Sequence, residues 1–135
     1  MGFTLVNELP TPAEILEQFP LADHLAALKK ERDEEIKKVI TGQSNKFLVI
    51  IGPCSADNED AVCDYANRLA KVQEATKDQL IIIPRVYTNK PRTTGEGYMG
   101  MLHQPDPEKK PDMLQGILAI RHMHMRVLRE TGMST

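Results

Sequence analysis

Three permanent cations lie within the stretch RVYTNKPRTT, residues 85–94, which follows directly on the apolar run LIII. They are Arg85, Lys90 and Arg92, and threonines and Pro91 lie among them. Guanidinium groups bind phosphate or carboxylate oxygens in pairs, and a lysine ammonium adds a compact point charge. An arbitrary cluster of such cations is more often a solvated loop, but its position after an apolar run favours the binding of a small polyanion.

A second candidate for chemistry is Cys54 in the sequence IGPCS, which follows the apolar run FLVII. A cysteine here can be a core residue, a thiolate nucleophile or a metal ligand. Composition alone favours core packing, whereas a place at the end of a strand favours metal ligation. A nucleophile needs an activating histidine, and none of the four histidines is an obvious partner; His122 and His124 face different ways on a predicted helix. Cys63, inside another predicted helix, is interpreted as core.

Charge and cysteine content limit the class of protein. The 135-residue chain has 17 Lys plus Arg against 19 Asp plus Glu, so a general nucleic-acid partner is not expected. The two cysteines form neither a disulfide framework nor a C-x-x-C site, which fits a reducing cytoplasm. We expect no secretion and no membrane partner, because no basic leader and no apolar stretch of about 18 residues is present.

Helical patterns precede the first apolar run. In TPAEILEQF, Thr11 as N-cap, Pro12 at the first helical position and Glu14 three residues after the cap predict a short helix with a capping box. Residues 21–42 predict an amphipathic helix that ends at Gly42.

The apolar runs predict two strands, residues 47–51 and 80–86, the first of them buried on both faces. A helix between them begins near Glu59, with Asp57 or Asn58 as its cap. Strand, helix and strand within about 30 residues indicate parallel strands joined by a right-handed crossover. We place Pro84 near the end of its strand, because proline donates no ladder hydrogen bond. Since ligands bind beyond the carboxyl ends of parallel strands, Cys54 and the cationic stretch should share one face.

The rest of the chain is a long loop and a last helix. Residues 87–110 are rich in glycine and proline, and a loop of this length is usually functional or disordered. Pro111 is predicted to open the last helix and Gly132 to cap it. The expected core side of this helix carries Leu114, Ile117, Leu118, Met125 and Leu128.

The sequences IGPCS and IIIPRVYTNKPRTTGEGYMGMLHQPDPEKKPD closely resemble the N-terminal third of class I, microbial-type 3-deoxy-D-arabino-heptulosonate 7-phosphate (DAHP) synthases. The KPRTT block is highly specific, and the similarity runs from about residue 10 to the end. The resemblance implies an α/β fold, the N-terminal portion of a (β/α)8 TIM barrel. Residues 1–45 would be a helical extension, and residues 46–135 the first two βα units. The family condenses phosphoenolpyruvate with erythrose 4-phosphate in the first step of aromatic amino-acid synthesis.

The same resemblance implies roles for individual residues. Cys54 looks like one ligand of a divalent metal ion, Mn²⁺ or similar, that is held only in the complete barrel. Arg85 looks like part of the phosphoenolpyruvate site. The element that meets erythrose 4-phosphate looks like Lys90, Pro91, Arg92 and Thr93. Lys90 also lies near phosphoenolpyruvate in this comparison, and Lys90 and Arg92 are the candidate catalytic residues.

Length is the main departure from the family. A (β/α)8 barrel needs about 250 residues, and this chain supplies two of its strands. The remaining metal ligands are expected beyond Thr135, and a lone thiolate does not hold an ion such as Mn²⁺. We therefore expect the chain alone to be inactive, with an exposed strand edge, and the full-length enzyme to be a homo-oligomer. The alternative is a short non-catalytic protein that binds phosphorylated ligands or pairs with a full-length synthase.

Overall fold

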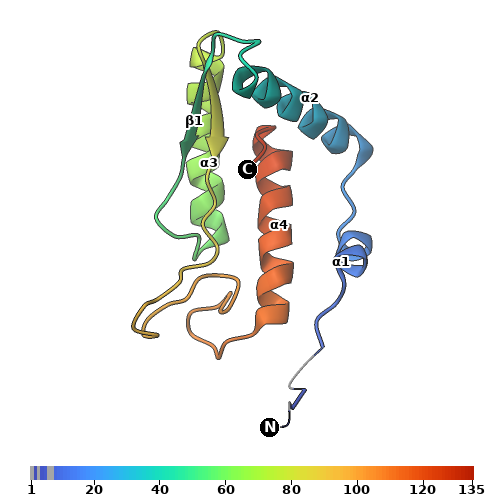
Figure 1. Cartoon of the computed structure of the whole chain (residues 1–135), viewed down its shortest axis with the longest axis vertical. Helices are drawn as coiled ribbons and strands as arrows, with labels where there is room; N and C mark the ends of the chain where they lie inside the picture. Colours follow the sequence, from blue (N-terminus) through green and yellow to red (C-terminus); the bar gives the residue numbers. More distant parts are fainter. Residues whose placement is uncertain (1, 3, 6–7) are drawn as a thin grey trace.

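The computed structural model describes residues 2, 4–5 and 8–135, so part of the expected N-terminal extension, residues 1, 3 and 6–7, lies outside the described residues. The elements follow the predicted order (Figure 1). They are α1 (Pro12–Gln18), α2 (Asp23–Ile40), β1 (Phe47–Ile51), α3 (Glu59–Thr76), β2 (Leu80–Pro84) and α4 (Met113–Thr131). The chain is therefore an α/β protein, as the sequence predicts.

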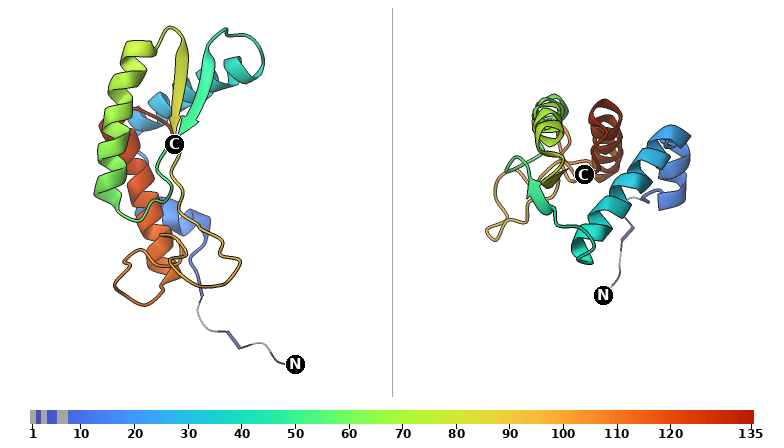
Figure 2. Two further views of the ribbon diagram at one scale, coloured as in Figure 1. Left: turned by 90° about the vertical axis from the view of Figure 1, so that its left-hand side faces the viewer. Right: turned by 90° about the horizontal axis from the view of Figure 1, so that it is seen from above.

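The two strands form a parallel sheet joined by the crossover helix α3. Their register runs from Phe47 opposite Leu80 to Ile51 opposite Pro84. Pro84 lies at the end of β2, near which it was predicted, and the strand ends there, two residues before the predicted end at residue 86. Figure 2 shows β2 lying between α3 and β1, so β1 is the strand farther from this helix. The carboxyl ends of both strands meet at one edge of the sheet, which fixes where the following loops begin.

Side chains cap the helices as the sequence predicts. The hydroxyl of Thr11 accepts from the N–H of Glu14, and the Glu14 carboxylate accepts from the N–H of Thr11. Asn58 accepts from an N–H in the first turn of α3 at 2.9 Å. Gly132 ends α4 in the left-handed conformation, with a φ of 68°. No helix in the described part of the chain is both long and apolar enough to cross a membrane.

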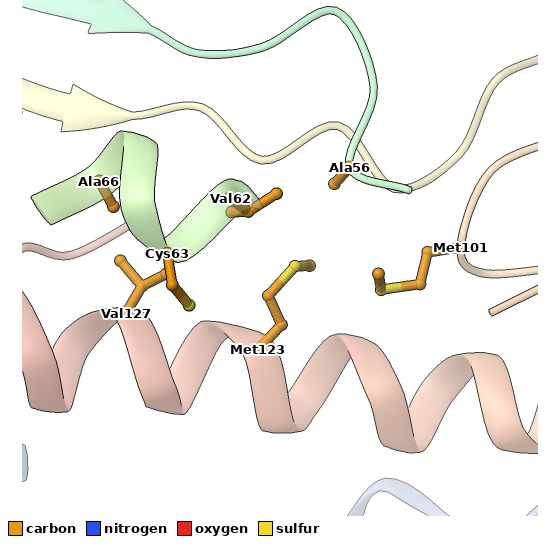
Figure 3. Close-up of a cluster of buried hydrophobic side chains, with 7 residues drawn as sticks. All are labelled: Ala56, Val62, Cys63, Ala66, Met101, Met123 and Val127. Atoms are coloured by element: carbon orange, nitrogen blue, oxygen red, sulfur yellow. The ribbon is translucent and has the colours of Figure 1, made fainter. Parts of the chain in front are cut away.

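The core lies between α3 and α4 (Figure 3). Cys63 is buried in it, which confirms its predicted role. Two loop residues belong to the same cluster, Ala56 after β1 and Met101 after β2. The full cluster is Ala56, Val62, Cys63, Ala66, Met101, Met123 and Val127. Both loops are therefore anchored in the core, each by one buried residue.

The prediction of which residues of α4 face the core is wrong for most of those named. Of the five expected core residues, only Leu128 is buried; Leu114, Ile117, Leu118 and Met125 are half-buried. The residues that face α3 include Met123 and Val127. Since α4 lies between α3 on one side and α1 and α2 on the other (Figure 1), its apolar side chains are divided between two contacts.

The start of α4 also differs from the prediction. The helix begins at Met113 rather than at Pro111. The reason is Asp112, whose carboxylate accepts from the N–H of Gln115 at 3.0 Å and makes it the N-cap.

The prediction that β1 is buried on both faces is also wrong. Phe47 is 74% exposed and Ile50 is 62% exposed. β1 has one neighbouring strand, and its other edge has none among the described residues. The exposed edge expected of a two-stranded sheet is confirmed.

Candidate functional site

The loops that leave β1 and β2 run side by side beyond the carboxyl ends of the strands. The N–H of Arg85 donates to the carbonyl of Ile51 at 2.9 Å, and the N–H of Ala56 donates to the carbonyl of Tyr87 at 2.9 Å. Gly52 makes this approach possible, because a Cβ there would lie 1.9 Å from the Arg85 carbonyl oxygen. The two stretches singled out from the sequence therefore share one face of the molecule, as predicted.

Cys54 and Lys90 meet at this face. The Nζ of Lys90 donates to the Sγ of Cys54 at 3.3 Å, and the Cys54 side chain is exposed. The backbone N–H of Lys90 also donates to the carbonyl of Met99 at 2.8 Å, which holds the residue from its other side. A sulfur and a fixed positive charge thus lie in contact at the edge where ligands of parallel α/β proteins bind.

Arg85 lies on the same face and has two further contacts. Its Nη1 donates to the carbonyl of Pro53 at 3.2 Å, and its guanidinium carbon lies 4.2 Å from the centre of the Tyr87 ring. Tyr87 was not identified from the sequence. A signal was present, because Arg85 and Tyr87 are two apart in extended chain, and such residues share one side. The guanidinium is held between a carbonyl and an aromatic face, while the residue remains exposed.

The other predicted site residues lie farther along the loop. The Nε of Arg92 donates to the carbonyl of Tyr98 at 3.1 Å, and Pro91 and Thr93 are exposed. Among the described residues, no hydrogen bond joins Arg92 to Lys90. The structure therefore joins Cys54 to Lys90 directly, holds Arg85 on the carbonyl of the neighbouring Pro53, and anchors Arg92 separately.

Backbone hydrogen bonds hold the two arms of the loop between residues 87 and 110 together. The N–H of Leu102 donates to the carbonyl of Thr88 at 3.0 Å, and this bond lies next to the bond between Lys90 and Met99. Gly100 has a φ of 101°, and a Cβ on it would lie 2.4 Å from the Thr88 carbonyl oxygen. A glycine is required where these two segments pass each other.

Tyr98 is a second loop residue that the sequence did not identify. Its hydroxyl is buried and has no hydrogen-bond partner among the described residues. Burial raises the pKa of this phenol, and the charge of Asp57 raises it further. The phenol therefore remains protonated near neutral pH and can act as a donor.

The described residues do not make a complete metal site. No three His, Cys, Asp or Glu side chains in this part of the chain lie close enough to hold an ion. Cys54 is exposed, and the neighbouring Ser55 Oγ is buried and has no hydrogen-bond partner among the described residues. His122 contacts Glu59 and His124 contacts Thr135, so the two histidines lie in different contacts.

This chain is similar in sequence to one protein family and to several of its curated members. The model of the DAHP synthetase I family matches residues 22–122. The phospho-2-dehydro-3-deoxyheptonate aldolase of Haemophilus influenzae is 41% identical over 100 residues, which cover 74% of this chain and 27% of that protein. The Phe-sensitive phospho-2-dehydro-3-deoxyheptonate aldolase of Escherichia coli K12 is 35% identical over 118 residues. These residues cover 87% of this chain and 33% of that protein.

A solved structure is also similar. The structure of phospho-2-dehydro-3-deoxyheptonate aldolase from Francisella tularensis SCHU S4 matches with a TM-score of 0.87 at 24% identity. The match covers 98% of this chain and 38% of that chain, and at this identity it shows the fold alone. The chain thus spans about a third of the length of the curated relatives it matches.

Proposed function

This chain belongs to the DAHP synthetase I family, and we propose that it forms the helical extension (residues 1–45) and the first two βα units (residues 46–135) of a DAHP synthase barrel. The complete enzyme is a transferase that condenses phosphoenolpyruvate with erythrose 4-phosphate, giving DAHP and phosphate. This reaction opens the shikimate route to chorismate and the aromatic amino acids. The parallel strands β1 and β2, joined by α3, support the barrel assignment.

The contact between Lys90 and Cys54 is the observation that carries the proposal. It joins the GPCS and KPRTT blocks, one βα unit apart in the chain, at the carboxyl end of the sheet. Both proposed substrates are phosphorylated anions, and preorganised cations stabilise such groups in a binding site. Arg85 and Lys90 are the proposed groups for phosphoenolpyruvate.

The second substrate, erythrose 4-phosphate, is assigned to the part of the loop around Arg92. Pro91, Arg92 and Thr93, together with Lys90, are the proposed element for erythrose 4-phosphate. Arg92 is held through its Nε by the Tyr98 carbonyl. Its terminal nitrogens make no hydrogen bond to other described residues and can meet a phosphate.

The proposed metal site takes one ligand from this chain and its other ligands from the rest of the enzyme. Cys54 is proposed as one ligand of a divalent ion, Mn²⁺ or similar, in the complete barrel. One thiolate does not form such a site, because these ions prefer several oxygen or nitrogen ligands. The 135-residue chain alone is therefore proposed to be inactive. The proposed setting is the cytoplasm, where Cys54 and Cys63 would remain free thiols. The full-length enzyme is proposed to be a homo-oligomer.

A graft tests the proposal. This chain replaces the matching third of the Haemophilus influenzae relative, and DAHP formation from the two substrates is measured. We expect the graft to be active, the graft carrying Lys90→Met to lose about 100-fold or more in rate, and the graft carrying Lys110→Met, an exposed loop lysine outside the site, to keep its activity. The chain alone should form no DAHP.

Two results would contradict the proposal. A graft that folds, as judged by near-UV dichroism, and forms no DAHP removes the assignment. If the graft does not fold, titration of the chain alone with phosphoenolpyruvate decides. Chemical-shift changes confined to Arg85, Lys90 and their neighbours support the site, and their absence at millimolar ligand removes it.

A further inference from the structure

The loop after β2 runs out from the sheet and returns beside itself (Figure 1). The N–H of Lys90, in the outgoing arm, donates to the carbonyl of Met99 in the returning arm at 2.8 Å. Residues 91–98, called the loop tip below, form the turn between the two arms. The loop tip contains Arg92, so the position of this arginine depends on how the turn is built.

Arg92 is tied to the loop tip at two points. Its backbone carbonyl accepts from the N–H of Gly95 at 3.1 Å, and its Nε donates to the carbonyl of Tyr98 at 3.1 Å. Gly97 lies beside the same side chain, since a Cβ on it would be 3.9 Å from the Nε of Arg92. The side chain of Arg92 therefore closes the turn in which it lies.

The bond to Tyr98 determines which edge of the guanidinium can bind a ligand. A guanidinium binds a phosphate either through Nε and one terminal nitrogen or through both terminal nitrogens. Nε carries a single hydrogen, and in Arg92 this hydrogen is donated to the Tyr98 carbonyl. The edge formed by Nη1 and Nη2 is therefore the one that Arg92 presents to a phosphate.

The side chain of Tyr98 and the backbone of Gly97 hold this carbonyl in place. The ring of Tyr98 is half-buried, and its hydroxyl is enclosed by the described residues. Burial raises the pKa of the phenol, and the charge of Asp57 raises it further, so the ring lies near the loop after β1. Gly97 has a φ of 87°, a conformation that residues with a side chain rarely adopt. The direction of the Tyr98 carbonyl thus depends on a buried ring and on a glycine before it.

We propose that Gly97 and Tyr98 are positioning residues for Arg92, and that they direct its two terminal nitrogens toward the phosphate of erythrose 4-phosphate. The inference rests on the proposed function, which assigns Arg92 to this substrate. An arginine that is already held in place loses less conformational entropy when the ligand binds, so the ligand binds more tightly. Arg85 is held by other contacts, so the effect is confined to one of the two substrates.

Steady-state kinetics of the graft with the Haemophilus influenzae relative test the proposal. Tyr98→Ala should raise the KM for erythrose 4-phosphate about tenfold, because a misplaced binding group has effects of this size. The KM for phosphoenolpyruvate and kcat should stay within about twofold of the unchanged graft. Tyr98→Phe keeps the ring and should restore the KM for erythrose 4-phosphate. Tyr65→Ala, at a half-buried tyrosine of α3, is the matched control and should leave both KM values unchanged.

The pattern of the two KM values distinguishes positioning from a general change in the loop. An equal rise in both KM values, or no rise in either, overturns the inference. So does a Tyr98→Phe graft that loses as much as Tyr98→Ala, because the hydroxyl would then be the important group. Gly97→Ala strains a residue with a positive φ and should give the same pattern as Tyr98→Ala. It replaces Tyr98→Ala if that graft is unfolded by near-UV dichroism.

A double substitution tests whether Tyr98 acts through Arg92. Lysine has no Nε–H of this kind, so Arg92→Lys removes the bond to the Tyr98 carbonyl. In a graft that carries Arg92→Lys, the further change Tyr98→Ala should alter the KM for erythrose 4-phosphate by less than about twofold. If the effects of the two substitutions multiply as independent effects do, the inference is overturned.

Nuclear magnetic resonance of the 135-residue chain gives a measurement that does not need activity. The Nε–H signal of Arg92 is identified by its loss in Arg92→Lys. Exchange of this hydrogen with water should be about tenfold faster in Tyr98→Ala than in the unchanged chain, and unchanged in Tyr98→Phe. Equal exchange rates in the three chains overturn the inference, whatever the graft does.

The same spectra separate a failure of this inference from a failure of the proposed function. An unchanged graft that folds and forms no DAHP contradicts the proposed function alone. Titration of the chain with inorganic phosphate then decides the inference. Phosphate should shift the Nη signals of Arg92 in the unchanged chain and in Tyr98→Phe, and should shift them far less in Tyr98→Ala. Equal shifts in the three chains, or none, overturn the inference.

Discussion

The ammonium nitrogen of Lys90 lies 3.3 Å from the sulfur of Cys54, although 36 residues separate them in the chain. The contact follows from topology, because β1 and β2 are parallel neighbours and their carboxyl ends share one edge. One loop is anchored in the core by Ala56 and the other by Met101. The core therefore sets the geometry of the proposed site. Substitutions in the site should change ligand binding, and substitutions in the packed interior should change the free energy of unfolding.

Replacement of Lys90 should weaken the binding of phosphoenolpyruvate to the chain. Lys90→Met removes a point charge beside the sulfur, and we expect about a tenfold rise in the dissociation constant, or about 1.4 kcal/mol. Lys90→Arg should also weaken binding, because the planar guanidinium does not replace a compact ammonium. Calorimetric titration at low salt measures both, with Lys110→Met as the control. Equal affinities for Lys90→Met and the unchanged chain would contradict the role of this residue.

Tyr87 should act through Arg85 rather than through the ligand. The ring lies under the guanidinium at 4.2 Å, and such contacts contribute about 0.5–1 kcal/mol at exposed sites. Tyr87→Leu should therefore raise the dissociation constant for phosphoenolpyruvate by about two- to fivefold, and Tyr87→Phe, which keeps the ring, should not. Calorimetric titration with phosphoenolpyruvate measures the dissociation constants of both variants. If Phe and Leu weaken binding equally, the hydroxyl matters and the ring contact does not.

Local patterns in the sequence predict much of this fold. Both strands, the capping box of Thr11 and Glu14, and the left-handed Gly132 each depend on a few neighbouring residues. The meeting of Cys54 with the cations also follows from local patterns, because a βαβ unit has one handedness and one common edge. These features require no knowledge of distant contacts.

Other features depend on contacts far apart in the chain. Gln73 looks like a surface residue of a helix, yet it is buried against the edge of β2. The inward face of α4 could not be predicted, because the helix has apolar neighbours on two sides. The exposure of β1 arises because it has one neighbouring strand in the described part of the chain, and the sequence FLVII does not indicate how many neighbouring strands it has.

Gly116→Ala should destabilise the chain. A Cβ on this residue of α4 would lie 2.0 Å from the carbonyl oxygen of Leu102, so the loop that carries the site would have to move. Overpacking of this kind costs about 1–3 kcal/mol of unfolding free energy, despite the better helix propensity of alanine. Urea unfolding measures the loss. Gln115→Ala, at an exposed neighbouring position, should change the unfolding free energy by less than about 0.5 kcal/mol.

The chain should lose stability in acid through the ion pairs between α3 and α4. Burial of Glu59 opposes its ionisation, but hydrogen bonds from Arg126 and His122 outweigh this and lower its pKa below the usual 4.5. Arg126 also lowers the pKa of Glu130, with a further contribution from Asn67. The unfolded chain therefore binds more protons than the folded chain as the pH falls. The stabilisation is complete above about pH 5 and is lost as the pH falls through the folded pKa values.

Thermal unfolding between about pH 6 and 3 measures this loss. Arg126→Gln removes the cation that Glu59, Asp60 and Glu130 share. The melting temperature of this variant should therefore be lower than that of the unchanged chain near neutral pH, and it should fall less steeply as the pH is lowered. Arg68→Gln is the matched control, because the pair of Arg68 with Asp64 is fully at the surface and contributes little. If Arg126→Gln and the unchanged chain lose stability in parallel, these ion pairs are not the source of the acid sensitivity.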